Sequence, residues 1–478
     1  MPEPSEPLYL ALDQGGHSSR ALVFSATGAL IAGAQVPVAT HAPQSGWVEQ
    51  NPGELVTSLR RAIIQVHASL GSDASRVRAA GLATQRSNIV CWDRRDGAAL
   101  SPALSWQDRR AQHWLSHLPC DDHWLHARTG LYRSPHYGAG KLRWCLDHVP
   151  AVRRAADEQR LCCGPLAAYL LANLLPGQPC VIDPANAART LLWNLAARDW
   201  DDELLNLFGI DRNILPDCMP TRCDYGMLAW GDDVLPLRVL TGDQSAALYA
   251  GGSPRSDTLY INLGTGAFLQ RPTNALAAAP EGLLAGIVYA DATRAEYVLE
   301  ATVNGAGTAV DWARERLGVH DIESQLAGWL AREGAIPVFL NGVAGLGSPW
   351  WRADFASRFI GAGERWAQVV AVAESIVFLI VTNLERLQGD APVRCIQVSG
   401  GLARLDSLCQ RLADVSGLTI LRSAQPEASA RGVAWLLADA EDRGWRDSAG
   451  EAFAPRVNPG CAERYRRWRA EMQQALRD

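Results

Sequence analysis

Residues 8–24 read LYLALDQGGHSSRALVF, and this stretch decides the fold that we expect for the chain. An apolar run ends at Asp13, a glycine turn follows at Gly15 and Gly16, and a second apolar run returns. Apolar, β-rich runs that are separated by glycine and small polar residues are typical of strands joined by a turn. The sequence therefore predicts a strand, a glycine turn and a returning strand near the start of the chain.

Residues 259–269, LYINLGTGAFL, repeat this pattern in the second half of the chain, with a turn at Gly264 and Gly266. A third strand is followed by Gly400 and Gly401. Backbone N–H groups in such turns can approach phosphate oxygens closely, because no side chain intervenes. Each turn alone is more typical of an ordinary hairpin, and only the recurrence of the pattern favours a phosphate-binding role. Two similar lobes whose turns face each other would form a cleft that holds a phosphate chain from both sides.

The pattern outside these turns alternates between strands and helices. Residues 52–70 have helical periodicity, with Asn51 as the expected cap and Pro52 in the first turn. Short strands are expected at 79–83 and 89–92, a mostly helical region at 107–207, a long helix at 364–387 and a strand at 395–399. This alternation predicts an α/β fold. The polar segment SPRSD places the domain boundary between residues 252 and 253.

Composition narrows the class of protein. The chain has 478 residues, 48% hydrophobic and 20% charged, and a formal net charge of -6, so we expect a folded protein for which nucleic acid is not a partner. Eleven cysteines without a C-x-x-C pair indicate free thiols in a reducing compartment. The amino terminus lacks a basic, apolar leader, and residues 369–381 are too short to span a bilayer. We expect a cytoplasmic protein without membrane contact.

Two aspartates follow strands of the expected cleft. Asp13 closes the first strand, and Asp243 lies between the strand VLTG and a helix. Ligands meet α/β sheets at such strand ends, where a carboxylate can hold Mg²⁺ or accept a proton from a hydroxyl. From spacing alone, Asp243 could equally cap its helix. A standard P-loop is absent, because Pro135 stands where the first glycine is needed before Lys141.

Several segments in order resemble the FGGY family of carbohydrate kinases, and within it the glycerol kinases. They are ALDQG at 11–15, SSRA at 18–21, GWVEQNP at 46–52, TQR at 84–86, SWQDRR at 105–110, NAARTLLWN at 186–194, DWDDELL at 199–205, GDQSAAL at 242–248 and GTGAF at 264–268. The resemblance implies an actin-like fold of two ribonuclease-H-like lobes around a central cleft. It also implies ATP and Mg²⁺ as cofactors and a hydroxyl of a small polyol or sugar as acceptor.

The resemblance assigns roles to individual residues. Asp243 matches the catalytic base and, with Asp13, the metal site. Residues 1–252 would then bind the acceptor. The residues expected to contact it are Arg86, Ser87, Trp106, His136 and Gln244, together with Phe268 of the second lobe. Residues 253–478 would bind the nucleotide; the expected cofactor-binding residues of both lobes are Gly15, Gly16, His17, Gly264, Thr265, Gly266, Gly400, Gly401 and Leu405.

The chain also departs from the pattern of glycerol kinases. Gly16 and His17 replace two threonines beside the phosphates. Ser87 replaces a glutamate and His136 a tyrosine in the acceptor pocket, so that glycerol itself is in question. In the acceptor pocket, Arg86-Ser87 also does not match the Met-His pair of xylulokinases. On the nucleotide side, Ser399 replaces an aspartate and Leu405 an asparagine, and Arg352 and Ala353 stand in for Asp and Pro.

Three functions are therefore considered. The first is an ATP-dependent kinase that phosphorylates a small polyol or sugar. The alternatives are a ketose kinase of the xylulose or ribulose type, and a catalytically impaired sugar-binding regulator. An actin-like ATPase acting on proteins is disfavoured by Arg86, Trp106 and Gln244. The sequence leaves the oligomeric state open, with a homo-oligomer as one alternative.

Overall fold

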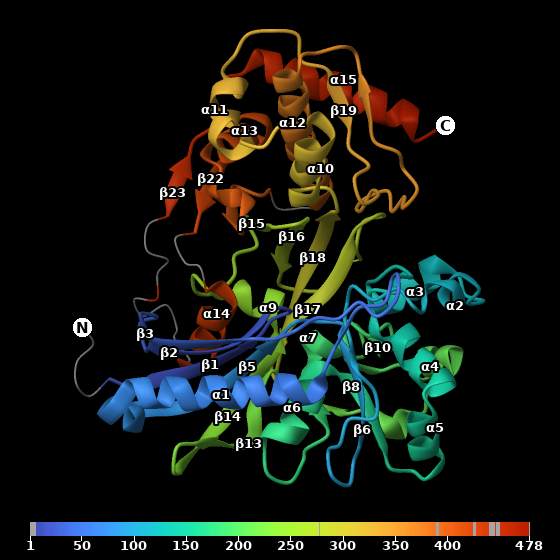
Figure 1. Cartoon of the computed structure of the whole chain (residues 1–478), viewed down its shortest axis with the longest axis vertical. Helices are drawn as coiled ribbons and strands as arrows, with labels where there is room; N and C mark the ends of the chain where they lie inside the picture. Colours follow the sequence, from blue (N-terminus) through green and yellow to red (C-terminus); the bar gives the residue numbers. More distant parts are fainter. Residues whose placement is uncertain are drawn as a thin grey trace.

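The computed structural model describes residues 6–276, 278–388, 392–423, 427–438, 445 and 450–477. Residues 1–5 lie outside the described residues. They belong to the amino-terminal stretch on which the expectation of no leader rests. The chain forms two halves, each built around one large sheet. The first half, which contains the strands of residues 8–24, lies below the second half, which contains those of residues 259–269, in Figure 1.

The sheet of the first half is built around the predicted hairpin. Among the described residues it has six strands, in the order β13-β14-β5-β1-β2-β3. Their bounds are β1 (Leu8–Gln14), β2 (Ser18–Ser25), β3 (Leu30–Pro37), β5 (Val77–Thr84), β13 (Arg222–Trp230) and β14 (Asp233–Gly242). β1 pairs antiparallel with β2 and parallel with β5, which pairs parallel with β14. β1 is buried almost throughout, as expected of a central strand.

The sheet of the second half repeats this arrangement. Its seven described strands are β17 (Leu284–Ala290), β18 (Ala295–Val303), β16 (Ala267–Thr273), β15 (Thr258–Leu263), β21 (Cys395–Ser399), β22 (Thr419–Arg422) and β23 (Glu451–Phe453), in this spatial order. Strands β18, β16 and β15 are antiparallel, and β15, β21 and β22 are parallel. The series β3-β2-β1-β5-β14 has the same directions. The predicted pair of ribonuclease-H-like lobes is confirmed.

Helices and short strands complete the first half. α1 (Pro52–Leu70) begins where predicted, because the side chain of Asn51 accepts hydrogen bonds from the N–H groups of Gly53 and Glu54. The others are β4 (Glu49–Gln50), β6 (Ile89–Asp93), β7 (Ala103–Leu104), α2 (Gln112–Ser116), α3 (Asp122–Thr129), α4 (Gly138–His148), α5 (Pro150–Asp157), β8 (Leu161–Pro165), α6 (Leu166–Leu174), β9 (Val181–Ile182), α7 (Pro184–Ala187), β10 (Trp193–Asn194), β11 (Asp199–Trp200), α8 (Asp202–Phe208), β12 (Asp217–Cys218) and α9 (Asp243–Ala247).

The long helix of the second half is buried. The helices and short strands here are α10 (Gly307–Leu317), α11 (Ile322–Leu330), β19 (Val338–Leu340), β20 (Arg358–Ile360), α12 (Arg365–Leu387), α13 (Asp406–Ser416) and α15 (Pro459–Ala475). By length and composition α12 is the one helix of the described residues that could cross a membrane, but 89% of its apolar window is buried inside the protein. We assign it to the core of the second half.

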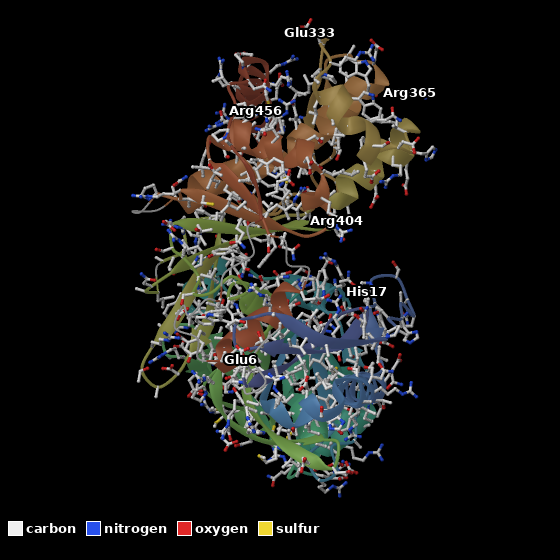
Figure 2. The ribbon with its side chains drawn as sticks, turned by 90° about the vertical axis from the view of Figure 1, so that its left-hand side faces the viewer. Glu6, His17, Glu333, Arg365, Arg404 and Arg456 are labelled. Atoms are coloured by element: carbon white, nitrogen blue, oxygen red, sulfur yellow. The ribbon has the colours of Figure 1, made fainter. Side chains whose placement is uncertain are left out.

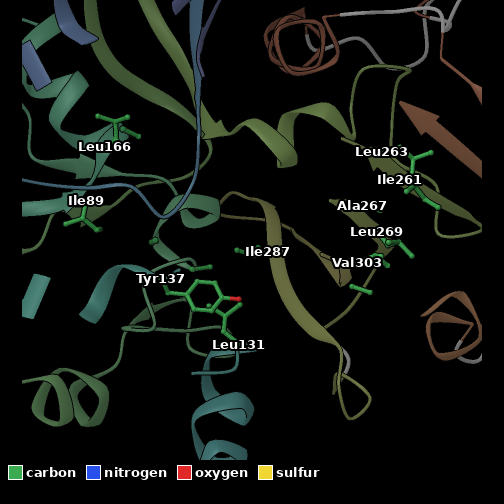
Figure 3. Packing of buried hydrophobic residues seen from close by; sticks show 14 of the residues in the cluster. Ile89, Leu131, Tyr137, Leu166, Ile261, Leu263, Ala267, Leu269, Ile287 and Val303 are labelled. Carbon is green, nitrogen blue, oxygen red and sulfur yellow. The ribbon is translucent and has the colours of Figure 1, made fainter. Parts of the chain in front are cut away.

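Two late segments of the chain reach back to the first half. α14 (Ala428–Ala438) packs on β1, β5 and α9, and Figure 1 shows it inside the lower half. A Cβ at Gly432 would collide with the main-chain oxygen of Ala246, so the close crossing of α14 and α9 needs glycine there. β17 also crosses over, since the Ala285 N–H donates to the Gly130 carbonyl (2.9 Å), and Figure 3 shows Leu131, Tyr137 and Ile287 packed close together. These contacts hold the two halves around their common cleft.

Candidate active site between the two halves

Asp13 lies where three strands of the first sheet end side by side. In the sheet register it is paired with Ala83 of β5, which is paired in turn with Thr241 of β14. Asp243 follows two residues after Thr241, so the topology brings the two carboxylates to one edge. Burial, and then the charge of Asp243, raise the pKa of Asp13 to about 7, while Arg20, 3.9 Å away, lowers it.

Asp243 is the first residue of α9 and is half-buried. Its Oδ1 accepts a hydrogen bond from the Gln244 N–H (2.7 Å), and the residue in the capping position is Gly242. Burial raises the pKa of the Asp243 carboxyl above its ordinary value, and the positive charges of Arg86 and Arg189 oppose that rise. A carboxylate with a raised pKa at a ligand-facing edge can accept a proton from a bound hydroxyl.

Two buried arginines beside Asp243 share one glutamate of the second sheet. Glu300 of β18 is fully buried. Its Oε1 lies 3.5 Å from Arg86 Nη1, its Oε2 contacts Arg189 Nη2, and Gln270 Nε2 donates to Oε1 (3.0 Å). Burial and the nearby Arg86 lower the pKa of Arg189 to about 9. Glu300 thus orients both guanidinium groups across the junction of the two halves.

Aromatic rings flank this charged group. The Arg86 guanidinium lies over the ring of Phe268, 5.5 Å from its centroid. Trp106 is 41% exposed, and its ring centroid is 5.5 Å from that of His136. Burial and then the charge of Lys141 lower the pKa of His136 well below its ordinary value, so the imidazole is neutral at neutral pH. Neutral and apolar walls of this kind suit an uncharged hydroxylated ligand.

Ser87 is buried, and its main chain adopts φ +66°, which is uncommon for a residue with a side chain. Its hydroxyl donates to the Arg189 main-chain carbonyl (3.4 Å). The hydroxyl of this predicted acceptor-binding serine therefore bonds to the backbone.

A cleft of about 410 Å³ lies next to these residues. Both halves line it, including Asp13 and Gln244 from the first and Gly400, Gly401 and Arg404 from the second. Its volume is in the range of small-molecule sites. Figure 2 shows Arg404 at the lower edge of the second half. His17, which lies in the first glycine turn, is at the upper edge of the first half.

The glycine turns form as predicted but differ in their relation to the cleft. Gly400 has φ +94°, and a Cβ there would lie 2.6 Å from Asn262 Oδ1, so the tight approach of this turn to β15 requires glycine. A Cβ at Gly401 would meet nothing within 4 Å. The Gly400-Gly401 turn therefore offers open backbone to a ligand.

Other residues expected to bind the nucleotide do not line this cleft. They are Gly15, Gly16 and the exposed His17 of the first turn, and Gly264, Thr265 and Gly266 of the second. Leu405 is half-buried, packs against the core and directly precedes α13. Their roles stay predictions.

A metal site would depend on Asp13 and Asp243. The described part of the chain contains no group of three or more His, Cys, Asp or Glu side chains that could hold a metal ion. The two carboxylates repel each other, which contributes to the raised pKa of Asp13, so a cation between them would be stabilised. Mg²⁺ prefers oxygen ligands and is often held by one or two carboxylates together with substrate phosphates. The residues present fit such an ion.

Sequence reasoning missed Arg189 and Glu300. Arg189 lies within the segment NAARTLLWN, which was used to identify the family but was given no role. Glu300 lies in β18, within the segment LEATV, and only its charge among buried neighbours could have indicated a functional role. α14 was missed as part of the site, although Ser429 Oγ donates to the Asp243 carbonyl (3.1 Å).

Models of protein families match both halves of the chain. The N-terminal domain of the FGGY family of carbohydrate kinases matches residues 8–248, and the C-terminal domain of this family matches residues 259–440. Among curated proteins, a glycerol kinase from Alkalilimnicola ehrlichii is 36% identical over 471 residues, with 94% of each chain covered. A glycerol kinase from Thermus brockianus is 35% identical over 488 residues, with 98% of each chain covered.

Solved structures share the fold. A glycerol kinase from Plasmodium falciparum with ADP superposes with a TM-score of 0.87 at 21% identity, covering 99% of this chain and 98% of the other. A xylulose kinase from Rhodospirillum rubrum gives a TM-score of 0.86 at 24% identity, with 98% of each chain covered. At these identities the likeness supports the two-lobed, actin-like fold alone.

Proposed function

The chain belongs to the FGGY family of carbohydrate kinases, and on this premise we propose how its cleft works and which acceptor it takes. The protein is a phosphotransferase that transfers the γ-phosphoryl group of ATP to an alcohol of a polyol or sugar. We propose a small polyol of the glycerol type as acceptor, because the curated relatives described above are glycerol kinases. A ketose kinase is less favoured, since the likeness to a xylulose kinase concerns the fold.

The observation that carries the mechanism is the placement of Asp243 beside Arg86 and Asp13 at one sheet edge. Asp243 accepts the proton of the acceptor hydroxyl as the hydroxyl oxygen attacks the terminal phosphorus of ATP, and the bond from that phosphorus to the bridging oxygen breaks to release ADP. The raised pKa of Asp243 makes it a better proton acceptor than an ordinary carboxylate. Most of the rate comes from holding the two substrates in line and from neutralising phosphate charge.

The nucleotide lies along the second half, with its adenosine against the open backbone of Gly400 and Gly401. Asp13 and Asp243 would hold Mg²⁺, which when bound supplies charge neutralisation at the phosphates. Arg20 also lines the cleft, and its charge lowers the pKa of Asp13.

The acceptor lies against aromatic walls that come from both halves. Arg86 and Gln244 can hydrogen-bond its hydroxyl groups, while Trp106 and Phe268 contact its C–H face. His136 provides a neutral ring nitrogen where glycerol kinases carry a phenol. This exchange changes which hydroxyl pattern is satisfied and is the reason to test several small polyols.

The test is ADP release by the purified protein across glycerol, longer polyols and ketoses. We expect release that depends on one small polyol and falls by about a hundredfold to ten-thousandfold in Asp243→Asn, which has nearly the same shape but cannot accept the proton. Equal ADP release by wild type and variant for every compound would refute the proposal.

Further expectations belong to the same proposal. Residues 1–252 bind the acceptor and residues 253–478 bind the nucleotide, with the boundary between α9 and β15. α14 adds to the wall of the first half, although it comes late in the chain. The cytoplasmic location and the Mg²⁺ requirement stay predictions, and the oligomeric state stays open.

A further inference from the structure

Lys141 is the only lysine in the chain, and it is fully buried in α4. Its Nζ donates to two main-chain carbonyl oxygens, those of Ser87 and His136, both at 2.7 Å. Within the described residues, no carboxylate lies within 4 Å to pair with this amine. The side chain therefore joins two loops by hydrogen bonds to their backbones.

Each of these two loops carries a residue that we propose to contact the acceptor. One presents Arg86 immediately before Ser87, and Ser87 holds a left-handed φ of +66° that costs conformational energy. The other presents His136, whose ring faces Trp106. Neither carbonyl belongs to a helix or strand, so Lys141 satisfies two acceptors that the regular structure leaves open.

Burying an amine at this position costs free energy. Burial lowers the pKa of Lys141 to about 7, Asp108 raises it, and Arg110 lowers it further. Methionine has a similar length and would fill the same space without that cost. A buried amine is retained where its N–H groups are needed, and they persist in the neutral as well as the charged form.

We propose that Lys141 is a positioning residue for the acceptor: it fixes the distance between the Arg86-Ser87 loop and the His136 loop and so sets the width of the acceptor pocket. This rests on the proposed kinase function, because it assigns the acceptor to that pocket. Lys141 acts through the two loops and touches neither substrate. The nucleotide side is independent of it, since Gly400 and Gly401 lie in the other half.

The test compares KM for the acceptor with KM for ATP in Lys141→Met. Without the two hydrogen bonds the loops separate, so KM for the acceptor should rise about tenfold or more while KM for ATP stays within about twofold. Lys141→Arg keeps N–H donors at this position and should recover part of the loss. Leu142→Ala is the matched control, because Leu142 is equally buried in the same helix but donates no side-chain hydrogen bond.

The outcomes separate the two proposals. If wild type shows no acceptor-dependent turnover with any polyol, the proposed function fails. We expect Leu142→Ala to affect acceptor and ATP equally. If wild type is active and Lys141→Met keeps its KM for the acceptor, or loses affinity equally for acceptor and ATP, the positioning role is wrong.

A second measurement needs no variant. Because the chain has one lysine, ¹³C-labelled lysine gives a single ε-methylene signal in an NMR spectrum of the intact protein. That signal should shift on saturation with the acceptor that the assay selects and stay in place with ADP alone. An unchanged signal at an acceptor concentration that saturates turnover would overturn the proposal.

Discussion

Glu300→Gln is the substitution that best tests how the two halves form the proposed acceptor site. Glu300 is fully buried and is the shared partner of Arg86 and Arg189. Glutamine keeps the shape and the contact with Gln270 but removes the charge. Two buried guanidinium groups then face each other with less opposing charge, and Arg86 turns toward its remaining anion, Asp243.

The magnitude follows from the burial of the pair. Removing one partner of a buried ion pair costs about 3–5 kcal/mol, a large part of the roughly 5–15 kcal/mol that stabilises a folded domain. The variant should still fold but unfold at lower denaturant concentration. A displaced Arg86 would also lower kcat/KM for the acceptor by about tenfold to a hundredfold, while KM for ATP changes little.

The assay is urea unfolding together with steady-state kinetics for each substrate. Glu374→Gln is the control, because Glu374 is also buried and pairs with Arg464 (2.6 Å) and Arg411 (3.4 Å), but in α12 of the second half. It should lose comparable stability without a selective loss for the acceptor. The reasoning is refuted if Glu300→Gln is as stable as wild type, or if both variants affect the acceptor equally.

Three further predictions concern the nucleotide side and pH. The pKa of Asp13 is about 7 in the folded protein against an ordinary 3.8, so the contribution of this carboxyl to stability is complete below about pH 4 and is lost as pH rises to 7. Asp13→Asn should therefore raise Tm at pH 8 but not at pH 4, which calorimetry can check. The same substitution should abolish Mg²⁺-dependent turnover. Gly400→Ala should raise KM for ATP and leave that for the acceptor, because the new Cβ would press on Asn262 Oδ1; equal effects on both KM values would contradict this. Since burial raises the pKa of Asp243, kcat should fall on the acid side at a higher pH than an ordinary carboxylate would give, and a pH–rate profile that is flat down to pH 4 would be inconsistent with its role as base.

Local signals predicted the fold because they coincide with its repeated unit. The run from Leu8 and the run from Thr258 both became central strands of equivalent sheets, and the cap at Asn51 was readable from three adjacent residues. Strand ends then located Asp13 and Asp243, since the end of a strand is a property of the local sequence. The identification of the family rested on the same short segments.

Contacts between distant segments could not be predicted in this way. α14 lies far along the chain from the sheet on which it packs, and its own sequence is an ordinary apolar helix. Glu300 contacts Arg86 and Arg189 only because β18 extends from the second sheet to these two arginines of the first half. Such pairings depend on how the halves dock, which residue spacing does not encode.

The most direct measurement follows the phosphoryl group itself. With ATP carrying ¹⁸O in its γ-phosphoryl group, mass spectrometry of the products should find the heavy oxygens attached to the polyol, and the rate should fall by about a hundredfold or more in Asp243→Asn. Heavy oxygens found only in inorganic phosphate, or transfer at the wild-type rate in Asp243→Asn, would contradict the account.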